Sequence, residues 1–267
     1  MTNEDVLTEI KDHIATITLN RPPHNFTDVV TMRTLADTFD SLCENSSVRV
    51  AILCSSGRSF SAGADFNKGG VGDPKTTSSD NPLENFRTST SEFYHEAIRI
   101  IKNPLVKIAA VNGAAVGAGL GLALACDFRI GSNRCWFQAS FVKLGIHPGF
   151  GLSYIVPTLI GHRHATDMFL TGRKIESDEA LQFGLLDCIT SEDALLGKSM
   201  EYANQLASVA PLALQSTRRT LREDINSNIE KVLEHELDEQ AKLILTQDAQ
   251  IGITASLNKT NPQFIGK

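Results

Sequence analysis

Two short segments rich in glycine and alanine carry the residue types best suited to chemistry. Residues 61–66 read Ser-Ala-Gly-Ala-Asp-Phe after a predicted strand, and residues 112–121 read Asn-Gly-Ala-Ala-Val-Gly-Ala-Gly-Leu-Gly between a predicted strand and a predicted helix. Small side chains let a ligand approach the main chain, and the free N–H groups at a helix N-terminus favour negative charge. Two such N–H groups directed at one oxygen would form an oxyanion hole, which suits a thioester carbonyl that becomes an enolate.

Either segment alone also fits a packing turn between two elements. The glycines of the second segment invite comparison with a dinucleotide-binding fingerprint, but Leu122 stands where the third glycine is required, and no acidic residue follows about 20 positions later. We therefore predict no nicotinamide dinucleotide site. A serine hydrolase is also excluded, because the segment around Ser153 lacks the second glycine of a nucleophile elbow.

Hydropathy patterns predict strands and helices that alternate along the first two thirds of the chain. Strands are predicted at 14–19, 48–54, 106–111, 128–130, 136–138 and 185–189. Helices are predicted from a cap at 27–28 to about 42, at 84–101, from the glycine-alanine segment to 125, at 151–160, 163–170 and 178–183, and along most of 193–258. Residues 67–82 are predicted to form a mobile surface loop. This order indicates an α/β fold with right-handed crossovers.

Composition and charge exclude several classes of protein. The 267 residues include 25 Lys and Arg against 31 Asp and Glu, a net charge of −6, and no like-charge run indicates nucleic-acid binding. The uncharged stretch 108–126 contains Asn112 and four glycines, which argues against a membrane span. Five cysteines without a CxxC motif and the absence of a signal sequence favour a cytoplasmic location.

Taken in order and spacing, several segments resemble the enoyl-CoA hydratase/isomerase, or crotonase, superfamily over essentially the whole chain. The matching segments are 18–22, 60–65, 104–119, 126–127, 144–149, 170–173, 180–185 and 259–264. The resemblance implies a crotonase-like spiral of ββα units, assigned to residues 1–192, and a C-terminal α-helical trimerisation region, residues 193–267. It further implies an acyl-CoA thioester as substrate, no prosthetic group or metal, and a homotrimer or dimer of trimers.

The resemblance also assigns roles to residues of the two small-residue segments. The backbone N–H groups of Ala64 and Ala118 would form the oxyanion hole. The nucleotide end of coenzyme A would lie near Pro23 and His24 and along the backbone of Ala62 and Ala64. The full substrate-binding set is Pro23, His24, Ala62, Gly63, Asp65, Phe66, Gly117, Gly121, Phe141, Leu144, Gly145 and Lys259. For two of these a structural role is an open alternative: Asp65 as a loop-holding side chain and Lys259 as a solvated tail lysine.

The sequence departs from the family pattern where acid–base chemistry is expected. Gly121 and Phe141 stand at the positions of the two glutamates that the family's hydratases use, and Gly149 stands where its isomerases often carry an acid. None of these three side chains transfers a proton. The aromatic ring of Phe141 would also make the pocket drier and disfavour hydration. Isomerisation, decarboxylation and thioester cleavage stay open.

Other side chains are candidates to supply the missing acid or base. Glu96, with its neighbours Glu92 and His95, and His147 are the acid–base candidates, each with a structural role as the alternative. The pair His162 and His164 is not predicted to bind a metal, because no third ligand is indicated. The leading hypothesis is an acyl-CoA-processing lyase or isomerase, and the alternative is a catalytically silent acyl-CoA-binding or assembly subunit.

Overall fold

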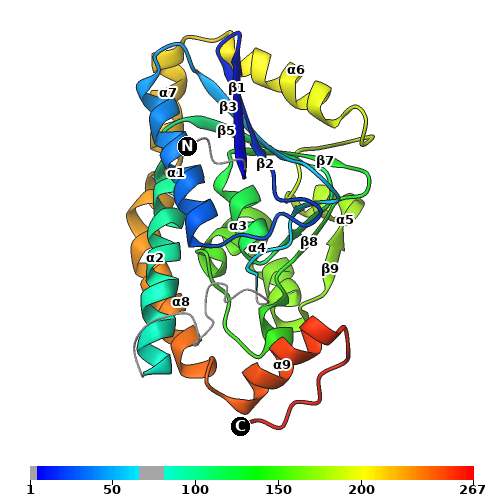
Figure 1. Cartoon of the computed structure of the whole chain (residues 1–267). Coiled ribbons are helices and arrows are strands. Elements are labelled where there is room, and N and C mark those ends of the chain that lie inside the picture. The colour runs from blue at the N-terminus through cyan, green and yellow to red at the C-terminus, as the bar shows by residue number, and fades with distance from the viewer. Residues whose placement is uncertain (1–4, 66–80) are drawn as a thin grey trace.

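The chain forms two β-sheets, and successive segments of the chain contribute strands to both of them (Figure 1). The computed structural model describes residues 5–65 and 81–267, so Phe66 and nearly all of the predicted loop at 67–82 lie outside the described residues. The larger sheet has the order β1, β2, β3, β5, β7, β10, with bounds Val6–Lys11, Ile14–Leu19, Val50–Ser55, Val106–Val111, Phe128–Ser132 and Cys188–Thr190. The smaller sheet has the order β4, β6, β8, β9, with bounds Ser59–Ser61, Ala114–Val116, Trp136–Gln138 and Lys174–Glu176.

Each turn of the chain adds one strand to each sheet before a helix returns it to the start. Strands β3 and β4, then β5 and β6, then β7 and β8 follow one another in this way, and neighbouring turns pair in parallel. Among the strands of residues 5–65 and 81–267, only the β1–β2 hairpin and the β8–β9 pair are antiparallel. The repeating unit is therefore strand, strand, helix, which confirms the predicted spiral fold.

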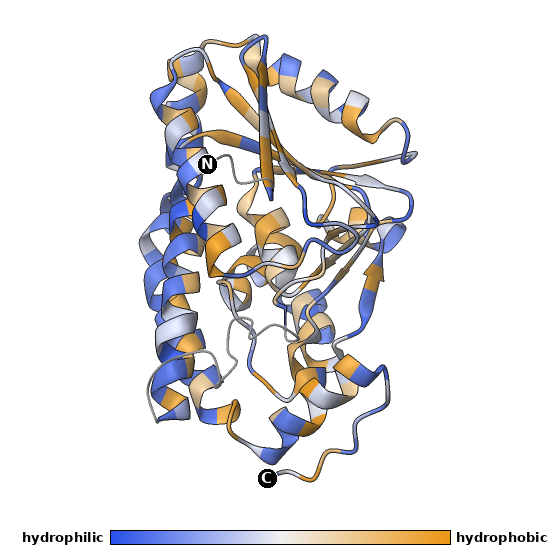
Figure 2. Ribbon diagram, viewed as in Figure 1, coloured by the Kyte–Doolittle hydropathy of each residue, from blue (hydrophilic) through white to orange (hydrophobic). Residues whose placement is uncertain are grey.

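Helices cover both faces of the larger sheet, so its central strands are buried on both sides. On one face lie α1 (Val29–Glu44), α2 (Pro82–Lys102) and α3 (Ala118–Ala125), and α6 (Leu195–Ala207) covers the other face (Figure 1). Figure 2 shows the hydrophobic side of α1 turned towards α3 and the sheet. Asp28 begins α1 as predicted, because its carboxylate accepts the N–H of Thr31 at 2.8 Å.

The remaining described helices are η1 (Ser140–Leu144), α4 (Leu152–Thr171), α5 (Ser177–Phe183), α7 (Pro211–Leu221), α8 (Glu223–Leu243) and α9 (Gln247–Asn258). Helices α7 and α8 lie on the same side of the molecule as α1 and α2, and α9 lies at the end opposite the β1–β2 hairpin (Figure 1). The two helices predicted at 151–170 are the halves of α4, which bends at Gly161, where φ is 74°. Helix α8 packs along α2, and α9 packs against η1. No helix in the described ranges combines the length and apolar character that a membrane span requires.

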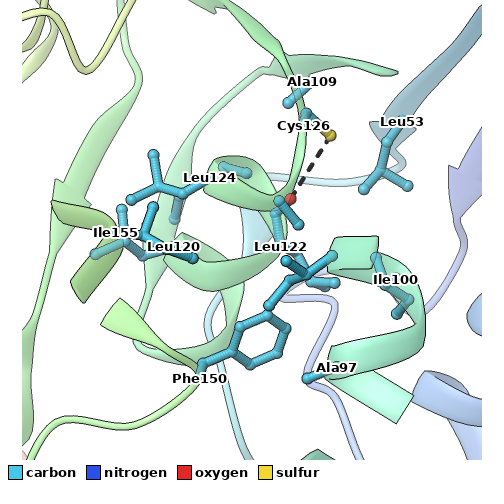
Figure 3. Packing of buried hydrophobic residues seen from close by; sticks show 14 of the residues in the cluster. Leu53, Ala97, Ile100, Ala109, Leu120, Leu122, Leu124, Cys126, Phe150 and Ile155 are labelled. Atoms are coloured by element: carbon cyan, nitrogen blue, oxygen red, sulfur yellow. Dashed lines mark hydrogen bonds between the residues drawn. The ribbon is translucent and has the colours of Figure 1, made fainter. Parts of the chain in front are cut away.

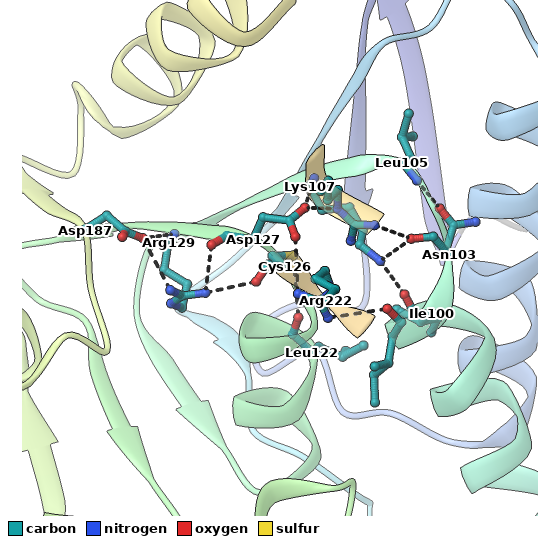
Figure 4. A network of polar contacts seen from close by, with 12 residues as sticks. Ile100, Asn103, Leu105, Lys107, Leu122, Cys126, Asp127, Arg129, Asp187 and Arg222 are labelled. Carbon is teal, nitrogen blue, oxygen red and sulfur yellow. Dashed lines mark hydrogen bonds and ion pairs between the residues drawn. The ribbon is translucent and has the colours of Figure 1, made fainter. Parts of the chain in front are cut away.

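A buried polar network ties the C-terminal helices to strand β5 (Figure 4). The carboxylate of Asp127 accepts hydrogen bonds from Arg218 Nε at 2.7 Å, Arg222 Nη1 at 3.2 Å and the main-chain N–H of Lys107 at 2.9 Å. Burial opposes ionisation of Asp127, but the two arginines outweigh it and lower its pKa. Burial and the charge of Arg218 lower the pKa of Lys107 to about 7. The division of the chain into a spiral core, residues 1–192, and a C-terminal helical region, residues 193–267, stays a prediction.

Several strands differ from the sequence expectation for identifiable reasons. Strand β1 was not predicted, because it is an edge strand whose residues after Val6 are exposed and show no apolar alternation. The predicted helix over 112–125 begins only at Ala118, since Ala114–Val116 pair with β4 and β8 instead. The strand predicted at 185–189 lies at Cys188–Thr190, because the N–H groups of Leu185 and Leu186 bond to the end of α5.

Candidate functional site

The two small-residue segments identified in the sequence meet main chain to main chain. A Cβ added to Gly63 would lie 2.7 Å from the carbonyl oxygen of Val116 and 3.5 Å from the nitrogen of Ala118. A Cβ added to Gly119 would lie only 2.1 Å from the carbonyl oxygen of Ser61. Contacts this close exclude any larger side chain at these two glycines. The structure therefore places Ala64 and Ala118 in adjoining segments.

The N–H groups of both alanines are left out of the surrounding main-chain pairing. In the parallel bridge between Thr27 and Ala64, the Gly63 carbonyl accepts the N–H of Thr27 at 2.8 Å, and the N–H of Ala64 takes no part. Ala118 is the first residue of α3, and its N–H precedes the first intrahelical donor, the N–H of Gly121. Within the described ranges, neither alanine N–H donates to a main-chain carbonyl. Both residues are half-buried, so a ligand oxygen can reach them.

A cavity of about 90 Å³ opens beside these two alanines. Its apolar walls come mainly from α2, η1, the segment 146–150 and the C-terminal half of α8. The described lining residues are Ala62, Gly63, Ala64, Phe86, Thr90, Phe93, Tyr94, Val116, Gly117, Ala118, Ser140, Phe141, Leu144, Ile146, Gly149, Phe150, Gln240 and Ile244. None of these side chains is ionised at neutral pH. The cavity is an apolar chamber with main-chain donors at one wall.

The ring of Phe150 fills the space beside Gly121 where a longer side chain would extend. A Cβ on Gly121 would lie 2.2 Å from Cδ1 and 2.4 Å from Cγ of Phe150. Figure 3 shows this ring between α3, near Leu122, and Ala97 of α2. Phe150 adopts a left-handed backbone conformation with φ of 65°, which is rare for a bulky residue and sets the direction of its ring. A carboxylate at position 121 is therefore incompatible with this packing.

Tyr94 occupies the corresponding space at Gly149. A Cβ on Gly149 would lie 2.0 Å from the hydroxyl oxygen of Tyr94. That hydroxyl donates to Oε1 of Gln240 at 2.9 Å, and the Gln240 amide donates to the carbonyl of His147 at 2.9 Å. Burial, and then the nearby charge of Glu236, raise the pKa of Tyr94 well above its usual value, so the phenol stays protonated. The phenol hydrogen of Tyr94 is thus engaged by Gln240 in the cavity wall.

The polar cavity residues Thr90, Tyr94 and Gln240 were not predicted from the sequence. One signal was available: Thr90 and Tyr94 are four residues apart and so share one face of the predicted helix. The signal was missed because the phenylalanines nearby on the same helix already indicate a face that packs on the core. Gln240 comes from α8, about 150 residues away, and no local pattern indicates its position.

The acid–base candidates do not line the cavity. The carboxylate of Glu96 is buried, but it accepts from Arg33 Nε at 3.1 Å and Arg99 Nη1 at 2.5 Å, between α1 and α2. The Nδ1 atom of His147 lies 2.8 Å from the carbonyl oxygen of Pro148, and its ring meets His235 edge-on at 5.9 Å. These contacts agree with the structural alternative for Glu96 and His147, which are not among the described residues that line the cavity, and their acid–base roles stay a prediction. Glu92 and His95 are exposed on α2.

The remaining predicted residues divide between the cavity and its surroundings. Gly117, Phe141 and Leu144 line the cavity, together with Ala62 and Gly63. Asp65 is buried outside the lining, and Gly145 packs against the first turn of α9, where a Cβ would lie 2.7 Å from the carbonyl oxygen of Asp248.

The segment expected to hold coenzyme A lies against the first donor segment. The N–H of Ala62 donates to the carbonyl of His24 at 2.9 Å, and Pro23 beside it is exposed. Lys259 is exposed at the end of α9 and does not line the cavity. In the described part of the chain, no group of three His, Cys, Asp or Glu side chains is arranged to hold a metal ion.

Comparisons with known proteins agree on one family. The enoyl-CoA hydratase/isomerase family model matches residues 9–267. A 1,2-epoxyphenylacetyl-CoA isomerase of Escherichia coli (strain K12) is 29% identical over 99% of both chains, and a crotonyl-CoA hydratase of Syntrophomonas wolfei is 30% identical over the whole of both. An enoyl-CoA hydratase structure from Bacillus halodurans has a TM-score of 0.83 at 28% identity, covering 94% of this chain and 99% of its own.

Proposed function

The chain belongs to the enoyl-CoA hydratase/isomerase family, and on that premise we propose that it stabilises the enolate of an acyl-CoA thioester with the N–H groups of Ala64 and Ala118. The observation that carries the proposal is the meeting of the two segments through Gly63 and Gly119, which leaves both N–H groups beside one cavity. The acyl group would enter the cavity, and the nucleotide end of coenzyme A would lie along Pro23 and His24.

The physical basis is electrostatic. As the thioester becomes an enolate, negative charge develops on its oxygen, and two fixed N–H dipoles stabilise that charge without reorganising. Ala118 also brings the positive end of the α3 dipole to the same oxygen. The apolar lining strengthens both interactions, because it keeps water away from the developing charge. Loss of one such donor typically lowers the rate about 100- to 1,000-fold.

We propose a lyase or isomerase reaction rather than classical hydration. Hydration needs groups that position water and move its proton, and no carboxylate or imidazole is among the described cavity residues. The rings of Phe150 and Phe141 occupy the region where hydratase glutamates are expected. The chemistry of an oxyanion hole needs no prosthetic group, and none is proposed here; coenzyme A enters only as part of the substrate.

We also propose that the chain forms a homotrimer or a dimer of trimers in the cytoplasm. Helix α7 supports the assembly, because its residues Leu212 and Leu221 are 80% and 78% exposed and only Arg218 of that helix is buried in the single chain. Apolar residues exposed in one subunit are commonly covered in an assembly.

The alternative is a catalytically silent acyl-CoA-binding or assembly subunit, favoured by the lack of ionisable side chains in the described lining. Exchange of the Cα protons of hexanoyl-CoA in D₂O separates the two functions. The N–H pair acidifies Cα whichever base removes the proton, so we expect exchange well above the rate without protein. Binding without such exchange would support the silent subunit.

Ala118→Pro tests the donor, because proline is tolerated at the first position of a helix and replaces the N–H hydrogen by a ring carbon. Ala118→Gly keeps the N–H and is the matched control. We expect exchange to fall at least about 100-fold in the proline variant and to change little in the glycine variant. Equal exchange rates in a proline variant that keeps its circular dichroism spectrum would refute the proposal.

A further inference from the structure

One polar group stands out in the cavity because nothing satisfies it. Thr90 is 1% exposed and lines the cavity, yet its hydroxyl has no hydrogen-bond partner among the described residues. A buried hydroxyl without a partner is unfavourable and rare in folded proteins. Such a group indicates that a ligand or water supplies the missing contact.

Other threonines in helices make a hydrogen bond that Thr90 lacks. Thr34, Thr38 and Thr158 each donate to the carbonyl four residues earlier, at 2.7 to 2.9 Å, the usual contact for a helical threonine. Thr90 makes no such bond to the carbonyl of Phe86. The hydroxyl that would ordinarily be paired within its own helix is therefore available in the cavity.

A second donor is the amide of Gln240, which is oriented by Tyr94, one helical turn from Thr90. Tyr94 follows Thr90 by four residues on the same face of α2, and its phenol donates to Oε1 of Gln240. This bond fixes the orientation of the Gln240 amide, since a donor must face the amide oxygen. One amide hydrogen of Gln240 bonds to the carbonyl of His147, and the amide group has a second hydrogen to offer.

We propose that Thr90 and Gln240 bind a neutral oxygen, a hydroxyl or a carbonyl, carried by the acyl group of the thioester, with Tyr94 positioning the Gln240 amide. The inference rests on the proposed acyl-CoA function. An oxygen fits because the two side chains present donors, whereas a plain hydrocarbon chain leaves Thr90 unpaired. A neutral oxygen fits because no Lys, Arg or His is among the described lining residues, and a buried carboxylate without a cation is strongly disfavoured.

Binding of matched thioesters tests the proposal. The probes are hexanoyl-CoA and its 3-oxo, 5-oxo, 3-hydroxy and 5-hydroxy derivatives, measured by calorimetry with the wild-type protein and with Thr90→Val, which replaces the hydroxyl by a methyl group of similar size. We expect at least one oxygenated thioester to bind about tenfold more tightly than hexanoyl-CoA, the effect of one or two hydrogen bonds. In Thr90→Val that preference should fall about tenfold, while hexanoyl-CoA binds as tightly as before or more tightly.

Ser89→Ala is the control, because Ser89 lies on the same helix outside the cavity lining and bonds to the carbonyl of Phe86. This variant should keep the wild-type preference. The thermal midpoint of Thr90→Val should not fall, since the substitution removes an unpaired hydroxyl. Equal loss of affinity for all five thioesters in Thr90→Val, or no preference in the wild type, would overturn the oxygen subsite alone. If hexanoyl-CoA binds no better than free coenzyme A and no derivative binds, the proposed function fails with it.

Discussion

The contact between Gly121 and Phe150 leads to a prediction in which one substitution changes sign. In the wild-type protein, Gly121→Ala places a methyl group within 2.2, 2.4 and 2.8 Å of three ring atoms of Phe150. Both residues are fully buried, so the ring has little room to move. We expect Gly121→Ala to destabilise the fold, although alanine is the better helix former.

The size of the effect follows from two opposing terms. Overpacking of a filled core costs about 1–3 kcal/mol, and overlap with three ring atoms places this case at the upper end. Alanine in place of glycine inside a helix contributes about 1 kcal/mol in the other direction. The net loss should be about 1–2 kcal/mol. Phe150→Ala alone should cost about 3–5 kcal/mol through the cavity that it leaves.

In a Phe150→Ala background the overlap is gone, and Gly121→Ala should then stabilise the protein by up to about 1 kcal/mol. The four proteins of this cycle are compared by urea denaturation at one fixed protein concentration, since assembly contributes to stability. The expected coupling between the two sites is about 2–3 kcal/mol. Effects that add to within about 0.5 kcal/mol would show that the Phe150 ring does not fill the space beside position 121.

Two further predictions concern buried charges. Burial raises the pKa of Glu236 from 4.5 to about 7, despite hydrogen bonds from Ser153. The folded protein therefore binds this proton more tightly than the unfolded chain, and the free energy of unfolding should fall by up to about 3 kcal/mol as pH rises from 4.5 to 7. The urea midpoints of Glu236→Gln should not show this dependence on pH. Asp127→Asn leaves Arg218 and Arg222 buried without their carboxylate, and it should lower the free energy of unfolding by about 3–5 kcal/mol. Asp187 forms a partly exposed ion pair with Arg129, so Asp187→Asn should lower it by about 1 kcal/mol or less in the same urea assay.

Local sequence patterns were sufficient for several elements. The capped helix after Asp28 agrees with prediction because its apolar residues face one core at helical spacing. The strand Val106–Val111 agrees because it is a short, mostly apolar run that is buried on both faces, and Trp136–Gln138 agrees as well. The short strand Ala114–Val116 could not be predicted, since its neighbours β4 and β8 lie far away in sequence and override a helical composition.

In the candidate site, too, the features with a local sequence pattern were predicted, and those set by tertiary packing were not. The two donor segments were identified from their small residues, because close main-chain approach leaves a local signature in glycine and alanine. The ion pairs of Glu96 with Arg33 and Arg99 could not be predicted, because they are set by the packing of two helices. The contact of Phe150 with Gly121 depends on the positive φ of Phe150, and a phenylalanine in the sequence does not indicate such a backbone angle.

The central claim is that two alanine N–H groups converge on one thioester oxygen, and a crystal structure with bound hexanoyl-CoA tests it most directly. We expect this oxygen to lie about 2.7–3.1 Å from the main-chain nitrogens of both Ala64 and Ala118, with the acyl chain in the cavity beside Phe141. A thioester oxygen bound elsewhere, or N–H groups that point away from it, would contradict the account.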